Sequence, residues 1–178
     1  MTGPFRLVPE PHRRAVQHTA SAATVVLFAA ILVLGLPLRT TAAPLGIVSL
    51  QLAAAPDAAT AMIDSWTAVP RSRVLWAHGL DLVLPFAYAL ALGMAVTRAA
   101  TRSAAAAPAA QLAAGAVIAA VVADQTENVA MFITLLLGPR WGSVLVTLAA
   151  ATVKFTTLMI AVVALAIALR NARQDIVT

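Results

Sequence analysis

The sequence has no cysteine and only one lysine among its 178 residues, and charged residues make up just 11% of it. Without cysteine the chain has no disulfide, thiolate metal site or cysteine nucleophile. No P-loop, Rossmann glycine pattern or nucleophile elbow is present either. Soluble domains carry about 25% charged residues, so the shortage of charge argues against a water-soluble fold.

Apolar residues take the place of the missing charge: 61% of the sequence is hydrophobic and its mean hydropathy is +0.90. They are concentrated in four runs, at residues 19–38, 74–97, 112–137 and 144–169. Runs of this length can cross a hydrocarbon core of about 30 Å as helices. We predict an all-α polytopic membrane protein, a single domain built as a four-transmembrane-helix bundle. Because three more spans follow the first run, we interpret that run as a retained span rather than a signal peptide.

The arginines predict an orientation. Seven lie on the side of the two termini and the 98–111 loop, namely Arg6, Arg13, Arg14, Arg98, Arg102, Arg170 and Arg173. Four lie on the other side, namely Arg39, Arg71, Arg73 and Arg140. The positive-inside rule then places both termini in the cytoplasm, with the chain in the cell (inner) membrane. Since the basic residues flank the spans, we expect the lipid bilayer as the partner and no nucleic acid.

The opposite side should carry the long 39–73 loop, the 138–143 turn and all three tryptophans. Trp66, Trp76 and Trp141 are expected to form an aromatic belt at that interface. Residues 56–66 have apolar side chains at helical spacing, which predicts a short helix in the long loop. Residues 46–52 alternate between polar and apolar, which favours an extended segment.

Ionisable residues inside the spans are the main functional signal. Asp81, Asp124, Glu127 and Lys154 each lie within an apolar run, where a charge costs about 2.5–3.5 kcal/mol even on the lenient insertion scale. Glu127 lies ten residues before Leu137 and Lys154 ten residues after Val144. Because a short turn joins those two spans, the two side chains should lie at matching depth and form an ion pair.

The second span has a polar stripe. His78, Asp81, Pro85 and Tyr88 follow one another at helical spacing, and Pro85 should free a backbone carbonyl. With Asp124, Glu127 and Asn128 they should share one polar interior. Three carboxylates against one lysine leave surplus negative charge, which favours a site that binds or moves protons or binds a cation. The Glu-x-x-His spacing of di-metal bundles is missing, so we predict no metal and no cofactor.

Several short motifs, taken in order, carry a resemblance: residues 45–53 (LGIVSLQLA), Ser65-Trp66, Leu80-Asp81, residues 127–130 (ENVA) and Lys154-Phe155. The chain resembles a family of small bacterial four-span membrane proteins that has no settled activity, over roughly residues 20–170. The resemblance implies the same architecture and singles out Asp81, Glu127, Asn128 and Lys154. It implies no mechanism.

Three functions remain open, and the sequence favours the first. The first is a membrane-embedded acid/base enzyme, such as an isomerase or cyclase, acting on an apolar isoprenoid or lipid-like small molecule. Its catalytic residues would be Asp81, Asp124, Glu127 and Lys154. Its substrate-binding residues would be His78, Tyr88 and Asn128. The second is a proton- or cation-coupled transporter, or a subunit of one; the third is a structural or accessory protein. Assembly as a homo-oligomer is also left open.

Overall fold

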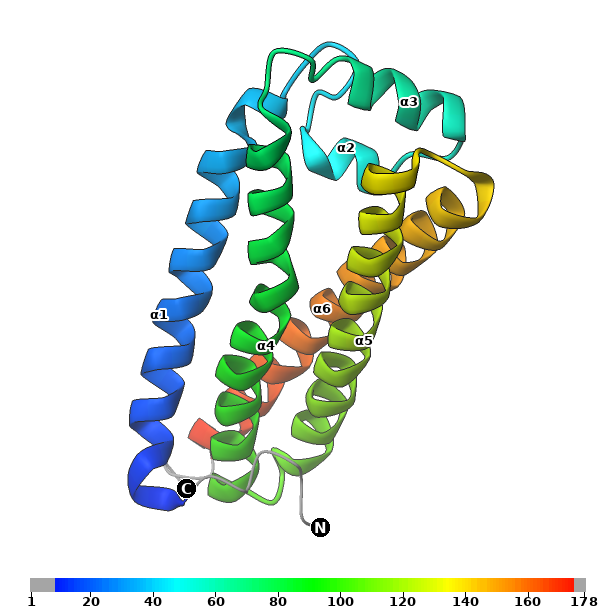
Figure 1. Ribbon diagram of the computed structural model, residues 1–178. Coiled ribbons are helices and arrows are strands. Elements are labelled where there is room, and N and C mark those ends of the chain that lie inside the picture. The colour runs from blue at the N-terminus through cyan, green and yellow to red at the C-terminus, as the bar shows by residue number, and fades with distance from the viewer. Residues whose placement is uncertain (1–8, 175–178) are drawn as a thin grey trace. The chain divides into compact units, whose positions relative to one another are not determined.

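A computed structural model describes residues 9–174 of the chain, and every regular element among those residues is a helix. Figure 1 shows the four long helices and the shorter ones between α1 and α4. In chain order the helices are α1 (Glu10–Gly35), the 3-10 helix η2 (Leu36–Leu38), α2 (Ile47–Gln51), α3 (Pro56–Asp64), α4 (Arg71–Arg102), α5 (Ala107–Leu137) and α6 (Trp141–Gln174). The predicted all-α fold, with its loop helix, is confirmed.

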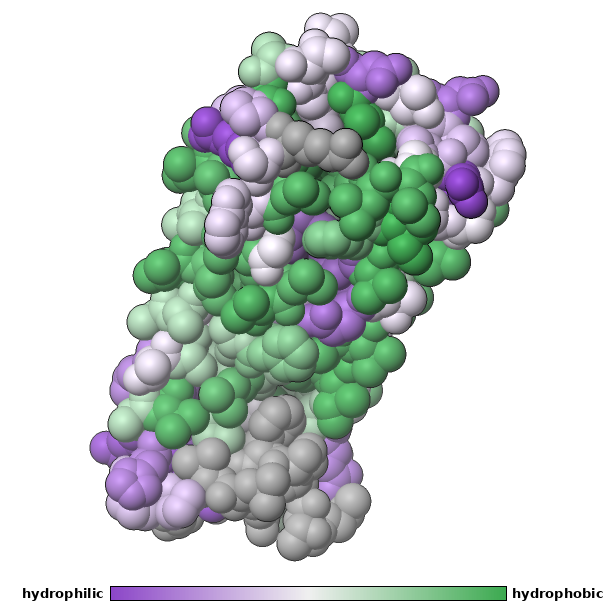
Figure 2. Space-filling view, in the orientation of Figure 1, coloured by the Kyte–Doolittle hydropathy of each residue, from purple (hydrophilic) through white to green (hydrophobic). Residues whose placement is uncertain are grey.

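Four helical stretches of 28 to 34 residues are long and apolar enough to cross a membrane. At 1.5 Å per residue each exceeds the roughly 30 Å of a hydrocarbon core. Their surfaces carry many exposed large apolar side chains, among them Val25, Phe86 and Leu137, and hydrophobic residues cover much of the face seen in Figure 2. A soluble monomer rarely exposes so much apolar surface. The protein is a multi-pass membrane protein.

Each long helix begins before its apolar run, and α4 and α6 also end beyond theirs. Helix α1 begins at Glu10, and Pro11 occupies its first turn, where proline is tolerated because its missing N–H would have no helical partner. Helix α4 continues to Arg102 and α5 begins at Ala107, so the alanine-rich stretch between the spans is mostly helical. Alanine has the highest helix propensity of all residues.

The long helices pass through two compact units. The terminal unit contains described residues 9–24, 86–121 and 154–174, and the loop unit contains residues 25–85 and 122–153. The core of the terminal unit is built largely from alanines, including Ala99, Ala113 and Ala168, all fully buried. Small side chains let helix backbones approach closely, which is how membrane helices pack without large apolar side chains.

The core of the loop unit is built from larger side chains, with Leu38, Trp66, Met131 and Val144 buried together. Trp66 donates from Nε1 to the carbonyl oxygen of Leu38 at 2.8 Å. Trp66 is therefore a packing residue that fastens the long loop to the end of η2. The expectation that Trp66 belongs to an interfacial belt is wrong, because its side chain is buried within the protein. Trp76 and Trp141 are exposed.

The expectation of an extended segment at residues 46–52 is also wrong, because Ile47–Gln51 form helix α2. The chain turns at Gly46, whose φ of 62° is one that side chains disfavour, and a Cβ there would meet the Gly35 carbonyl oxygen at 3.3 Å. An isolated extended segment would leave its backbone groups unpaired. A helical turn pairs them locally, and Ser49 Oγ accepts a further bond from the Leu45 N–H.

Candidate functional site

Three carboxyl groups meet in the loop unit. Asp81 comes from α4, and Asp124 and Glu127 come from α5, where a spacing of three residues places them on one face. One carboxylate oxygen from each residue lies within 4.8 Å of the other two. Asp124 is 3% exposed, Glu127 is fully buried and Asp81 is partly buried. We call these three side chains the carboxyl cluster.

Asn128 connects the carboxyl cluster to α4. Its side-chain Nδ2 donates to Asp124 Oδ1 at 3.3 Å and to the backbone carbonyl oxygen of Asp81 at 3.2 Å. The residue is fully buried, and its Oδ1 makes no hydrogen bond with any described residue. The Asn128 amide therefore binds the carboxyl group of Asp124 and the backbone of Asp81, two residues of the cluster.

Pro85 explains why that backbone oxygen needs a donor. In a regular helix the Asp81 carbonyl accepts from the N–H of residue 85, which proline lacks. The Asn128 amide supplies this bond instead, as expected from the sequence prediction of a freed carbonyl. Gln125 Nε2 donates in the same way to the Leu82 carbonyl at 2.9 Å. Two amides of α5 thus hold the stretch of α4 that Pro85 weakens.

His78 lies one turn before Asp81 and is fully buried. Its Nε2 is 2.9 Å from the carbonyl oxygen of Asn128. Since a carbonyl only accepts, Nε2 must carry the proton. The ring also lies against Phe132, with ring centroids 5.3 Å apart. Asn128 is therefore hydrogen-bonded to both residues: its backbone oxygen accepts from His78, and its side-chain amide donates to Asp124.

The electrostatics of the cluster limit its ionisation. Two unit charges 4.8 Å apart repel by about 3–4 kcal/mol at an effective dielectric constant of about 20, and three carboxylates make three such pairs. Buried acids this close share protons, bind a cation or pair with a basic side chain. Ca²⁺ binds oxygens at about 2.3–2.6 Å, so ligands on opposite sides of it lie about 4.6–5.2 Å apart. The oxygen-only set could thus hold a hard cation; the prediction of no metal stays a prediction.

The other predicted site residues belong to the terminal unit. Lys154 is 5% exposed, and its Nζ lies 4.9 Å from the ring centroid of Phe155. Tyr88 is also buried, at 8% exposed. Because both lie in the terminal unit and the cluster lies in the loop unit, the Glu127–Lys154 ion pair and the single shared interior stay predictions.

Sequence reasoning brought Asp81, Asp124, Glu127, Asn128 and His78 to one site, and the structure places all five in the loop unit. The sequence reasoning missed two supporting residues, Gln125 and Phe132. Gln125 could have been found, since an amide one turn from Asn128 on a span facing Pro85 is a candidate donor. Phe132 had no such signal among so many apolar residues.

No family model, curated protein or solved structure matches the chain. The class of protein therefore rests on fold and site alone. It is a multi-pass helical membrane protein with a carboxyl cluster, a histidine and an asparagine buried between two of its long helices.

Proposed function

We propose that the protein takes up and releases a proton at the carboxyl cluster, as a proton-coupled transporter or a subunit of one. The observation that carries this proposal is the approach of Asp81, Asp124 and Glu127 to within 4.8 Å inside an apolar helical protein. Three full negative charges at that distance repel one another strongly, and a shared proton relieves the repulsion.

Burial favours proton transfer over chemistry on a bulky substrate. Asp124, Glu127 and Asn128 are between 0% and 3% exposed, so an isoprenoid-sized molecule would have to displace packed side chains to reach them. A proton needs only a relay of side chains or water. His78 and Asn128 support the cluster rather than carry the proton, since His78 Nε2 donates to the Asn128 carbonyl and Asn128 Nδ2 donates to Asp124 Oδ1.

The acid/base enzyme, the first choice from the sequence alone, is the second candidate here, and one observation favours it. Asp81 is only partly buried, so a small apolar substrate could meet that carboxyl at the edge of the cluster. In this reading Asp81 donates or accepts the proton and the two buried acids set its protonation.

Purified protein in sealed vesicles tests the proposal. An imposed membrane potential should drive proton entry, reported by a pH-sensitive dye inside the vesicles. Asp124→Asn should abolish the flux, whereas Asp64→Asn, which changes an exposed acid of α3, should leave it intact. Flux that survives Asp124→Asn would exclude the cluster as the proton site.

The proposed setting is a bacterial cell membrane with both termini in the cytoplasm. The arginine distribution supports the orientation, and the resemblance to bacterial four-span proteins supports the source. A reporter fused after Thr178 should be active only in the cytoplasm, and one inserted near Ala55 only outside. An external C-terminus would contradict this orientation.

A further inference from the structure

A second feature of the loop unit lies apart from the carboxyl cluster. A groove of about 700 Å³ runs along α5 and the start of α6, within the range of about 300–1,000 Å³ typical of ligand pockets. Its walls are mainly apolar, with Val129, Ile133 and Val146 among them. These residues are exposed, and none of the three acids of the cluster lines the groove.

Most polar groups in the groove wall already have partners within the protein. The Gln125 amide donates to Leu82, and Thr126 Oγ1 donates to the carbonyl of Val122 at 2.8 Å. Ser143 Oγ donates to the carbonyl of Arg140 and is hydrogen-bonded to Thr134 Oγ1. Of the residues that line the groove, only Arg140 is charged. A ligand that fits these walls has an apolar body and one anionic end.

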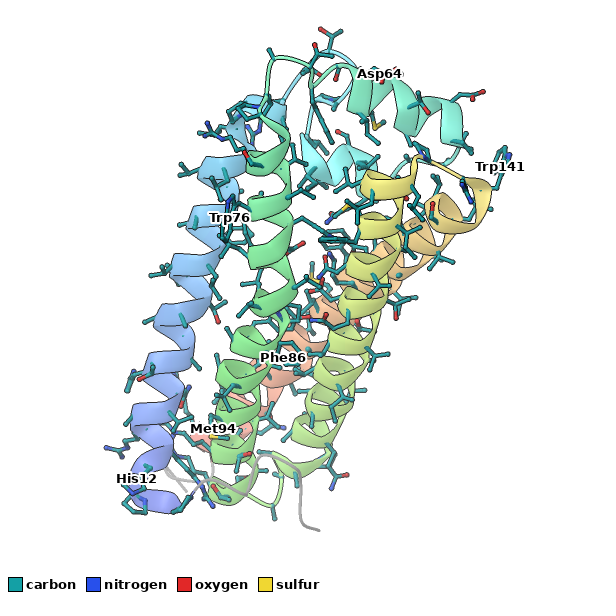
Figure 3. The ribbon with its side chains drawn as sticks, in the orientation of Figure 1. His12, Asp64, Trp76, Phe86, Met94 and Trp141 are labelled. Carbon is teal, nitrogen blue, oxygen red and sulfur yellow. The ribbon has the colours of Figure 1, made fainter. Side chains whose placement is uncertain are left out.

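The position of Arg140 matches that of a lipid headgroup. Arg140 lies in the turn between the end of α5 at Leu137 and the start of α6 at Trp141. Trp141 is 62% exposed and points away from the helices in Figure 3. Exposed tryptophans at helix ends mark the headgroup level of a bilayer. The α5 residues in the groove wall, from Ile133 to Gln125, span about 12 Å along the helix, a length suited to part of an acyl chain.

We propose that this groove binds one anionic membrane phospholipid. The guanidinium of Arg140 binds the phosphate, for which its planar fork of N–H donors is suited. An acyl chain lies along Val129, Ile133 and Val146. The bound lipid stays in the leaflet that contains the α5–α6 turn. This binding is independent of the proton chemistry proposed for the carboxyl cluster.

Tryptophan quenching measures the binding directly. The protein carries Trp76→Phe, which leaves exposed Trp141 and buried Trp66 as fluorophores. It is reconstituted in phosphatidylcholine vesicles that contain either brominated phosphatidylglycerol or brominated phosphatidylcholine at equal fractions. The anionic lipid should quench Trp141 more strongly. Arg140→Gln should lower this preference about fivefold, the factor that one basic residue contributes at an anionic surface.

Matched controls separate the groove from general charge. Arg39→Gln removes the same charge from another exposed arginine of the loop unit and should leave the preference unchanged. An equal fall in both arginine variants, or no fall in Arg140→Gln, would overturn the proposal.

Filling the groove gives the second arm of the test. A Cβ at Gly142 meets nothing within 4 Å, and the same holds at Gly115 in the terminal unit. Gly142→Leu should therefore fold and displace the lipid, and Gly115→Leu should not affect binding. Retained lipid preference in Gly142→Leu would overturn the proposal. If Gly142→Leu instead lost self-association while its lipid preference stayed unchanged, the proposal would also fail, because the groove would then be occupied by a second copy of the chain.

Discussion

Asn128→Leu is the most informative single change in the carboxyl cluster. The substitution keeps a side chain of similar size but removes two hydrogen bonds, to Asp124 Oδ1 and to the Asp81 carbonyl. Side-chain hydrogen bonds in membrane proteins average about 0.6 kcal/mol, with a maximum of about 1.7 kcal/mol. Two lost bonds therefore predict a loss of about 1–3 kcal/mol in unfolding free energy. Leucine also removes Asn128 Oδ1, a buried acceptor without a partner, which offsets part of this loss.

Gln125→Leu is the matched control for this prediction. Gln125 lies on the same helix and loses one amide-to-carbonyl bond, to Leu82, but no bond to a carboxyl. Its expected cost is about 0.6–1.7 kcal/mol, roughly half that of Asn128→Leu. Reversible unfolding in mixed micelles, followed by the fluorescence of buried Trp66, measures both. An Asn128→Leu loss no larger than that of Gln125→Leu would refute the claim that Asn128 stabilises the cluster.

Three further changes test other parts of the molecule. Trp66→Phe leaves the buried Leu38 carbonyl without its donor and should cost about 1–3 kcal/mol of unfolding free energy, whereas exposed Trp76→Phe should change it by less than about 0.5 kcal/mol; equal effects would contradict the packing role. Pro85→Ala restores the N–H that the Asp81 carbonyl lacks as a helical partner, so this N–H competes with Asn128 for the carbonyl. Proton flux should change while stability holds or rises, and an unaltered flux would show that the Asp81 carbonyl plays no part in proton transfer. Glu127→Gln and Lys154→Met should each cost about 3–5 kcal/mol, and the double variant should recover most of that loss; additive losses would dismiss the ion pair predicted from the sequence.

Much of the fold could be predicted because a bilayer leaves few solutions. Long apolar runs in such a chain must be helices that satisfy their own backbone groups, and the structure has four of them. The loop was harder to predict. The alternation in residues 46–52 does not follow burial, because Ser49, Leu50 and Gln51 are all buried in helix α2, and a stretch of that length fits either periodicity.

The site was predictable in its residues but not in its geometry. Isolated acids in apolar spans must face inward, which singled out Asp81, Asp124 and Glu127 before any coordinates. The meeting of Asn128 with the Asp81 carbonyl depends on how α5 is rotated against α4. That rotation is set by how the side chains of the two helices pack against each other, and the sequence of both helices is apolar nearly throughout.

Infrared spectroscopy of the carboxyl groups tests the central claim most directly. A protonated carboxyl has a carbonyl stretching band that a carboxylate lacks. At neutral pH, without added divalent cations, the protein should show this band. Asp124→Asn and Glu127→Gln should each diminish it, while Asp64→Asn should leave it unchanged. A spectrum with only carboxylate bands at neutral pH would contradict a shared proton in the cluster.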